Sequence, residues 1–440
     1  MPVDLEIGFA PETLVEGSPE ECAAFGLFKI QSRHGSLTEG WDHFLGGSRS
    51  GPLVSAYHVA EWLAWNWWRQ RWEPRRSTAE WDLAHRMNSI GEGYVWPNVT
   101  IFSDGERTAL LSAASENPDT KPFRYFGSVA AVVPSRTFET AVDEFVGQVL
   151  ARLQAQRIPD SNLSRLWADV LAERGDPEVV RRRRIEAMLG REPDAIEDDQ
   201  VERLIRDAVS LGEDAVREVA ADASSSSAND RLLMTADRFK VLAETQGVEG
   251  SLRDAVRLID PPAAQRSELP AWKLGALVAK SLRTQERLTS KKITNARLAD
   301  FAGTRIELLT RRNNSDRPMS FSLSDNRQGS RFVIRASGSA GRRFALARLI
   351  GDQLLNREGH LHPATRSATY RQKAQRSFAA ELLSPFDAVQ DMMAGDYSLE
   401  MQQDVAEYFS VSPMTINTLL KNHGSIERDD PEQYIEALVA

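Results

Sequence analysis

Two breaks in the apolar pattern constrain the fold of this chain most strongly, because each interrupts the periodicity that one continuous core would need. The run Ser224–Ser227 has the low-complexity composition typical of a linker. The pair Pro261-Pro262 disfavours a helix or a central strand at a second point. We therefore predict the main boundary between these breaks, near residue 250. A chain of 440 residues can form about three domains of roughly 150 residues each.

Tryptophans dominate the pattern of the first part of the chain. Within residues 55–72, Trp62, Trp65, Trp68 and Trp72 recur at spacings of three or four, which predicts a helix. Seven of the ten tryptophans lie between residues 62 and 96, so a base-stacking platform or a sugar site is one interpretation. Because no histidine or carboxylate constellation flanks them, we predict instead that they form the wall of a core.

Strand patterns follow, and helical patterns replace them after Pro134. Residues 99–111 alternate around the turn signal Ser103-Asp104-Gly105, which predicts a hairpin, and residues 123–133 predict a further strand. Helical patterns then cover residues 137–154, 163–173, 177–189, 198–220 and 230–245. We therefore predict a Trp-rich α+β domain over residues 1–135 and a helical extension with a linker over residues 136–250.

Four consecutive arginines, Arg181–Arg184, lie inside one of these helical patterns. An acidic cluster follows closely, made of Glu192, Asp194, Glu197, Asp198 and Asp199. The nearness of both signs predicts a local charge clamp or a solvated face rather than a nucleic-acid patch.

Composition limits the compartment and the class of protein. No apolar run reaches the 18 or so residues that a membrane helix needs. The N-terminal stretch lacks a basic region followed by an apolar one, and Cys22 alone cannot form an internal disulfide. We expect a cytoplasmic protein with no membrane partner.

Net charge is distributed very unevenly along the chain. The total of −9 divides into −14 over residues 1–265, +15 over residues 266–376 and −10 over residues 377–440. An asymmetry of this size indicates either a binding surface or a contact between the basic segment and the protein's own acidic flanks.

The last third of the chain predicts the order helix, helix, sheet, helix. The expected elements are helices over residues 271–288 and 294–301, a strand over 305–310, a strand pair over 321–336, a helix over 343–355, a loop over 359–363 and a long helix from 369 past 383.

Three ordered segments of this region resemble the ImmA/IrrE family of zinc endopeptidases. They are Arg342–Leu355 (RRFALARLIGDQLL), Gln375–Pro385 (QRSFAAELLSP) and Val405–Gly424 (VAEYFSVSPMTINTLLKNHG). In that family the first segment typically reads RFTLAHELGHLLL and the second AN-x-FAAELLMP after an acidic residue, while the third contains a V-S-P helix-turn. Pro270–Arg283 is also similar to the family's entry helix, so the resemblance covers about residues 265–425.

The residues that carry the chemistry of that family are replaced here. In H-E-x-x-H two histidines at i and i+4 bind zinc and the glutamate polarises water. The corresponding positions are Arg348, Leu349 and Asp352, and the stretch Arg371–Gln375, where the third ligand is expected, has no carboxylate. Arginine does not lose its proton at useful pH and leucine has no acid–base chemistry. The resemblance therefore implies a zincin-like pseudo-metallopeptidase domain over residues 251–395, with no cofactor.

Two further interpretations of this site follow from the residues. Arg348 and Asp352 are spaced i, i+4, so we expect a salt bridge in which a guanidinium occupies part of the place of the metal. Alternatively, a relocated metal site could use His360, His362, Asp352 and Glu381, although a loop H-x-H has no fixed face and a catalytic site also needs an acid placed beside the bound water.

The acidic end of the chain has a helix-turn-helix pattern, with Ser412–Leu420 in the place of a recognition helix. Residues 377–440 hold two basic and twelve acidic residues, which suits phosphates poorly. We therefore predict a helical tail over residues 396–440 that packs on the peptidase-like domain.

The basic segment, residues 266–376, is the better candidate for a charged partner. Its candidate surface comprises Arg311, Arg312, Arg317, Arg327, Arg331, Arg335, Arg342 and Arg343. Few aromatic residues interleave with them, which favours backbone contacts over base stacking.

These observations lead to three functional hypotheses. The first is a non-catalytic regulatory or scaffolding protein that binds a protein partner through the former peptidase groove; the resemblance implies bacterial stress or phage-related regulation as its context. The second is nucleic-acid binding through the basic segment. The third is a zinc endopeptidase with a relocated metal site.

Overall fold

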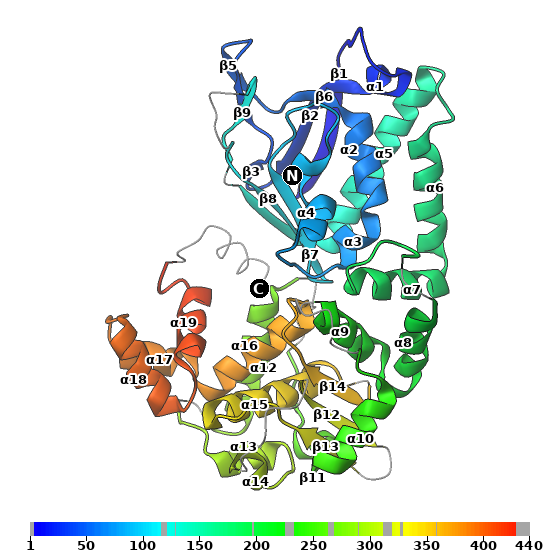
Figure 1. The fold of residues 1–440 in the computed structure, drawn as a ribbon. Helices are drawn as coiled ribbons and strands as arrows, with labels where there is room; N and C mark the ends of the chain where they lie inside the picture. The colour runs from blue at the N-terminus through cyan, green and yellow to red at the C-terminus, as the bar shows by residue number, and fades with distance from the viewer. Residues whose placement is uncertain are drawn as a thin grey trace. The chain divides into compact units, whose positions relative to one another are not determined.

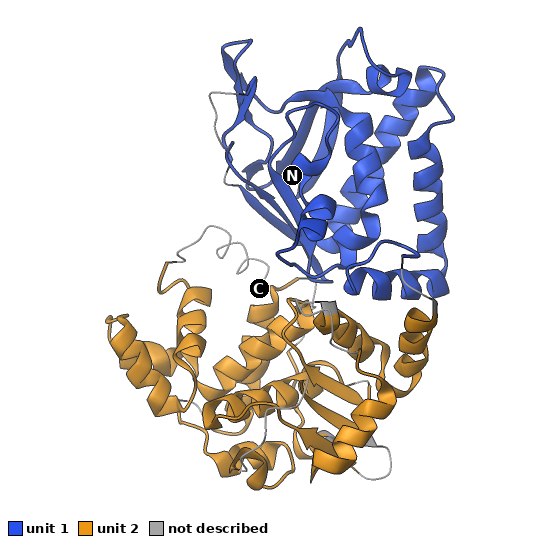
Figure 2. Cartoon of the chain, in the orientation of Figure 1, with its two compact units in different colours: residues 1–197, 439 blue, residues 198–438, 440 orange. Residues whose placement is uncertain are grey.

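The computed structural model forms two compact units, unit 1 up to residue 197 and unit 2 from residue 198 (Figure 2). The fold class is α+β, as the sequence predicts. The described residues are 4–115, 121–127, 129–195, 198–224, 233–262, 268–288, 290–310, 319–325, 329–357 and 359–427.

The division between the units differs from the predicted boundaries at residues 135, 250 and 395. The long helix α5 (Ser135–Ala155) packs on the first strand of unit 1, and the helices between Pro134 and residue 197 belong with that unit. Residues 198–250 belong with unit 2, because the strand β11 (Val248–Gly250) pairs within the sheet of unit 2.

Unit 1 consists of three antiparallel sheets with helices packed against them (Figure 1). In the first sheet β2 (Phe25–Ser32) pairs with β1 (Leu5–Pro11), β3 (Gly35–Ser36) and β6 (Leu53–Ser55). The second has the order β10 (Ala130–Pro134), β8 (Arg107–Ser112), β7 (Val99–Ser103), and the third β5 (Gly47–Arg49), β4 (Gly40–Asp42), β9 (Phe123–Tyr125). The other helices are α1 (Pro19–Ala23), α2 (Ala56–Trp65), α3 (Trp67–Trp72), α4 (Ala79–His85), α6 (Asn162–Gly175) and α7 (Pro177–Met188), with a 3₁₀ turn at Met87–Ser89.

The tryptophans of unit 1 belong mainly to its core, which confirms the core prediction. Trp62, Trp67, Trp68, Trp81 and Trp96 are buried. Burial of such large rings removes much apolar surface from water, and that is the main favourable term for this core.

The predicted helix over residues 55–72 is interrupted at Asn66. Its side-chain Nδ2 donates to the carbonyl oxygen of Trp62 at 2.9 Å, and α3 begins one residue later. An asparagine that bonds backbone groups in this way competes with the helix pattern.

The arginine run on α7 forms the predicted charge clamp. Arg183 donates to Glu173, Glu186 and Asp194 at 2.6 to 2.9 Å, and Arg182 pairs with Glu186 at 3.1 Å. These contacts join α7 to α6 and to the loop after α7, so the positive charge of the run is neutralised within unit 1.

Unit 2 contains a four-stranded antiparallel sheet of order β11, β13 (Gly329–Val333), β12 (Ser320–Asp325), β14 (Leu361–Ala364). Helix α15 (Ser339–Leu355) lies near one face, and α10 (Ala236–Gln246) packs on the other through Phe239 and Phe321, whose ring centroids are 4.9 Å apart. The remaining helices are α8 (Asp198–Leu211), α9 (Glu213–Ser224), α11 (Leu252–Ala255), α12 (Ala271–Gln285), α13 (Asn295–Phe301), α14 (Glu307–Thr310), α16 (Tyr370–Leu383), α17 (Phe386–Met393), α18 (Leu399–Phe409) and α19 (Pro413–Asn422).

Three secondary-structure predictions in unit 2 are wrong. Residues 305–310, predicted as a strand, contain the short helix α14, because so short an apolar run does not distinguish the two periods. Residues 359–363, predicted as a loop, contribute to the edge strand β14. The helical pattern over residues 198–220 is interrupted at Gly212, whose φ of +100° lies in a region that only glycine adopts readily.

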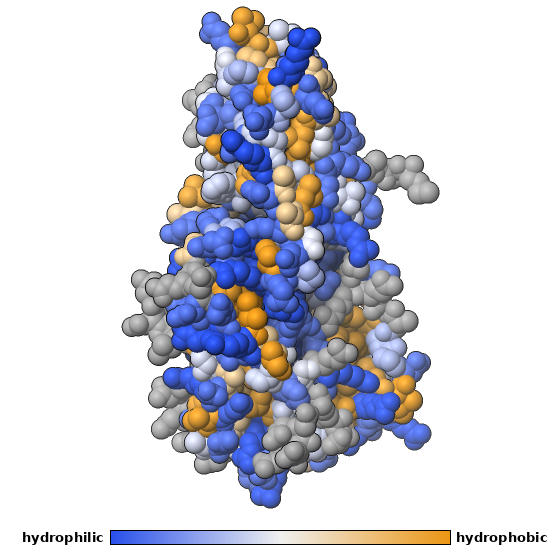
Figure 3. All heavy atoms as spheres, turned by 90° about the vertical axis from the view of Figure 1, so that its right-hand side faces the viewer, coloured by the Kyte–Doolittle hydropathy of each residue, from blue (hydrophilic) through white to orange (hydrophobic). Residues whose placement is uncertain are grey.

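The described helices include none long and apolar enough to cross a membrane. On the face drawn in Figure 3, hydrophobic side chains form narrow bands between hydrophilic ones, which is an ordinary pattern for a protein surface.

Candidate functional site

Helices α15 and α16 lie against each other and carry Arg348, Asp352 and Arg371, residues of the stretches in which the sequence resemblance predicts the metal-site positions. Gly351 permits the close approach, because a Cβ at this position would lie 2.5 Å from the ring of Phe378. The N-terminus of α16 is fixed by Thr369, whose side chain accepts a hydrogen bond from the amide of Gln372. Arg348 and Asp352 on α15 are therefore held near the first turns of α16.

Asp352 is the centre of a buried ion network. Arg371 donates to both carboxylate oxygens, from Nε to Oδ1 at 2.8 Å and from Nη2 to Oδ2 at 2.5 Å. His362 Nδ1 lies 2.9 Å from Oδ2, and Asn356 Nδ2 donates to Oδ1 at 2.7 Å. Because a carboxylate only accepts, Nδ1 of His362 carries the hydrogen.

The charge state of Asp352 follows from these contacts. Its side chain is fully buried, and burial alone opposes ionisation. The guanidinium of Arg371 and the ring of His362 outweigh burial and hold the pKa of Asp352 well below its usual range. Asp352 is therefore an ionised carboxylate whose two oxygens are already engaged.

Arg348 does not pair with Asp352, so the predicted i, i+4 salt bridge is wrong. Its Nη2 instead donates to the carbonyl oxygen of Thr365 at 2.8 Å and to the side-chain oxygens of Gln372 at 2.5 Å and Gln375 at 3.3 Å. Burial and the neighbouring Arg376 lower the pKa of Arg348 to about 9. The guanidinium remains charged at neutral pH and cannot donate a lone pair to a metal.

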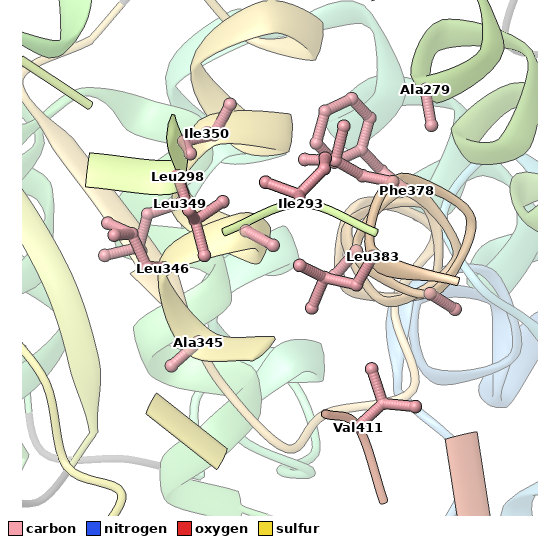
Figure 4. Close-up of a cluster of buried hydrophobic side chains, with 14 of the residues drawn as sticks. Ala279, Ile293, Leu298, Ala345, Leu346, Leu349, Ile350, Phe378, Leu383 and Val411 are labelled. Carbon is pink, nitrogen blue, oxygen red and sulfur yellow. The ribbon is translucent and has the colours of Figure 1, made fainter. Parts of the chain in front are cut away.

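Leu349 has the place of the general base in the resembled motif and lies in the hydrophobic core of unit 2. Figure 4 shows its side chain beside those of Leu298 and Leu346, in a cluster that also contains Ile293 and Ile350. Leu349 is fully buried. The position therefore contributes packing and has no route to proton transfer.

The residues of the predicted relocated metal site are not brought together as a set. His362 contacts Asp352, but Glu381 accepts hydrogen bonds from the amide of Phe386 at 3.3 Å to each oxygen and lies 3.9 Å from Lys280 Nζ. Glu381 thus caps the N-terminus of α17. Among the described residues, no group of three or more histidine, cysteine, aspartate or glutamate side chains could hold a metal ion.

Two carboxylates from α9 complete this region, and neither was among the predicted site residues. Glu218 accepts hydrogen bonds from Thr369 Oγ1 at 2.7 Å and Ser367 Oγ at 3.4 Å, and Asp222 accepts from the amide of Arg366 at 2.9 Å. Burial raises the pKa of Glu218, although Arg371 partly offsets this effect. The sequence feature that could have identified these two acids is their i, i+4 spacing on an otherwise apolar helix face.

The helix pair α8 and α9 also covers the free edge of β14. The amide of His360 donates to the carbonyl oxygen of Leu211 at 3.2 Å, just before the strand, and the Arg366 amide bonded to Asp222 lies just after it. An uncovered edge strand offers unpaired backbone groups to another chain. Here the chain's own helices satisfy donors at both ends of that edge.

The predicted basic surface is only partly a surface. Arg342 is buried and donates to the carbonyl oxygens of Leu309 and Ser337, and Arg343 is buried and donates to that of Ile293. Placing these two arginines on the surface was wrong, because both bond backbone carbonyls in the interior. Arg331 pairs with Glu249 at 3.1 Å, Arg335 is half-buried, and Arg311, Arg312, Arg317 and Arg327 lie outside the described residues.

Within the segment predicted as a helical tail, α18 and α19 form a helix pair, and residues 428–440 of that segment lie outside the described residues. A short turn joins α18 to α19, and Ser412 caps α19 by accepting a hydrogen bond from the amide of Thr415. Comparison with protein-family models, with curated proteins and with solved structures gave no match to this chain.

Proposed function

We propose that this protein is a non-catalytic regulatory or scaffolding protein, built on a zincin-like fold similar to that of the ImmA/IrrE family, that acts by binding a protein partner. The context that the resemblance implies is bacterial stress or phage-related regulation. The observation that carries the proposal is the bidentate pairing of the fully buried Asp352 with Arg371.

The atoms available as ligands at this site also argue against a bound metal. A zinc site of the HExxH type needs two neutral imidazoles, a third ligand and a free position for water. At these positions the chain has a guanidinium, a leucine and a carboxylate whose oxygens are both occupied. Gln372 and Gln375, in the stretch expected to supply the third ligand, accept hydrogen bonds from Arg348 instead.

The position of α9 bears on how a partner would bind. Glu218 and Asp222 bond the segment between β14 and α16, and this contact supports a partner surface elsewhere than at the α15–α16 site.

A cleavage assay on the purified full chain tests the proposal. The protein is incubated with a complex peptide mixture, with zinc added or with a chelator, and new termini are identified by mass spectrometry. We expect the same peptides in both arms and in a no-protein control. Cleavage that appears with zinc and disappears with the chelator would overturn the proposal.

A further inference from the structure

The small sheet of β5, β4 and β9 in unit 1 has one face exposed to solvent. Trp41 in β4 pairs with Ser48 in β5 and with Arg124 in β9, and the carbonyl oxygen of Glu39 accepts a hydrogen bond from the amide of Phe126. Directly opposed residues share a face of an antiparallel sheet. Glu39, Trp41, Ser48, Arg124 and Phe126 therefore lie on one face, and all five are exposed.

This face and the turn beside it carry large apolar side chains that are exposed to solvent. Trp41 is 39% exposed and Phe126 is 45% exposed, while Phe44 and Leu45 in the turn after β4 are 87% and 66% exposed. Tryptophan and phenylalanine are enriched at protein interfaces, and a cluster of exposed large apolar side chains marks an interaction site more often than chance.

The turn that presents Phe44 and Leu45 is held in place. Asp42 Oδ1 accepts hydrogen bonds from the amides of Phe44 at 2.9 Å and Leu45 at 3.2 Å, and its Oδ2 pairs with Arg49 at 2.8 Å. The two apolar side chains are therefore presented without a large ordering cost on binding, which increases affinity.

Charges of both signs surround the apolar centre. Glu39 and Arg124 lie on this face, are exposed, and form no salt bridge with a residue that the structure describes. Glu39 disfavours a polyanion such as a nucleic acid, and Arg124 disfavours a strongly basic partner. A symmetric contact between two copies satisfies both signs, because Glu39 of each copy can then pair with Arg124 of the other.

We propose that the exposed face of the β5-β4-β9 sheet, with Trp41 at its centre, is a self-association surface that binds a second copy of this chain. The inference is independent of the function proposed above. Three strands of three residues each, with one turn, form a small interface. Small interfaces of below about 1,200 Å² in total are typical of weak complexes, so we expect a weak dimer.

Sedimentation of the full chain tests the proposal. Between about 1 μM and about 200 μM, a range that brackets micromolar affinity, the weight-average mass is expected to rise from 49.1 kDa toward twice that value. Trp41→Ala is expected to weaken the dimer at least about tenfold. The control is Trp65→Ala on α2, which removes a tryptophan that is 60% exposed outside this face and should leave the dissociation constant unchanged.

A charge exchange gives the sharper test. Arg124→Glu and Glu39→Arg are each expected to weaken the dimer, and the double variant is expected to restore it to within about threefold, because the opposed charges are then exchanged in both copies. A chain that stays monomeric throughout the range, a dimer unaffected by Trp41→Ala, or a double variant weaker than either single variant would each overturn the proposal.

Discussion

The spacing of residues along one helix does not explain why Asp352 pairs with Arg371 rather than with Arg348. The i, i+4 rule identifies neighbours on one helix, and an acid on the C-terminal side of a base is the weaker orientation of such a pair. Arg371 lies 19 residues further along, on α16, and reaches both carboxylate oxygens. Arg348 and Leu349 alone predict that this site holds no metal, but the partners of Asp352 depend on how the two helices pack.

Removal of Arg371 is expected to destabilise the protein strongly. Arg371→Met leaves an ionised, buried Asp352 without its main partner, which costs about 3–5 kcal/mol. Adding Asp352→Asn should recover part of this loss, because the unpaired charge is then gone. Urea unfolding measures both effects, with the exposed Arg357→Met as the matched control, expected within about 0.5 kcal/mol of wild type. A double variant no more stable than Arg371→Met would contradict the ion-network account.

Glu381 gives the molecule a predictable pH dependence. Burial raises the pKa of Glu381 to about 7, above the ordinary value of 4.5, despite the nearby Lys280. The folded state therefore binds more protons than the unfolded state between these pH values, and this contribution to stability is lost as pH rises through about 7. Glu381→Gln keeps an oxygen to cap α17 and cannot titrate. We expect it to lose less stability than wild type between pH 5 and pH 8 in urea unfolding, and equal losses would refute the assignment.

Among the helices and strands, the elements with a regular apolar pattern could be predicted from the sequence, whereas some short elements could not. The hairpin over residues 99–111 and the helix over residues 163–173 were predicted because their periodicity is strong and local. The strand β14 was missed because His362 and Pro363 give no alternating apolar signal, and it exists because it pairs with β12. The covering of β14 by α8 and α9 is a tertiary contact between segments about 150 residues apart, which single-sequence patterns do not encode.

The contact of α9 with the segment after β14 can be tested by hydrogen exchange. Asp222→Ala removes the acceptor for the Arg366 amide, a loss of about 1–3 kcal/mol for a buried group. Peptides that cover residues 360–369 are therefore expected to exchange roughly tenfold faster. Asp214→Ala, on the same helix but at an exposed position, is the control and should change little. Unchanged exchange in Asp222→Ala would show that α9 does not hold this segment.

At the scale of the whole molecule, the folded structure differs from the sequence-based expectation in where the basic residues lie and in where the chain divides. Four arginines of the segment with a net charge of +15, Arg283, Arg342, Arg343 and Arg371, are buried. The guanidinium groups of these arginines therefore bond carbonyl oxygens and Asp352 in the interior and do not contribute to a basic surface. The serine run indicated a break but not which unit the flanking helices join, because that depends on β11 and α10 packing on the sheet of unit 2.

Fragments of the chain test this boundary. A fragment of residues 198–440 keeps β11, α9 and α10 and is expected to unfold cooperatively on heating, as followed by circular dichroism. A fragment of residues 251–440 lacks the β11 pairing with β13, the Phe239–Phe321 contact and the carboxylates of α9. It exposes a sheet face and an edge and should not unfold cooperatively. Equal cooperativity in both fragments would place the boundary near residue 250 after all.

The central claim is that an ion network has replaced the metal at the α15–α16 site. The most direct test is the zinc content of the full chain, expressed with added zinc, dialysed and measured by mass spectrometry. Because Arg371 occupies both oxygens of Asp352 and Arg348 cannot ligate, we predict less than about 0.1 zinc per chain. About one zinc per chain, lost in Asp352→Asn protein that remains folded, would contradict the account.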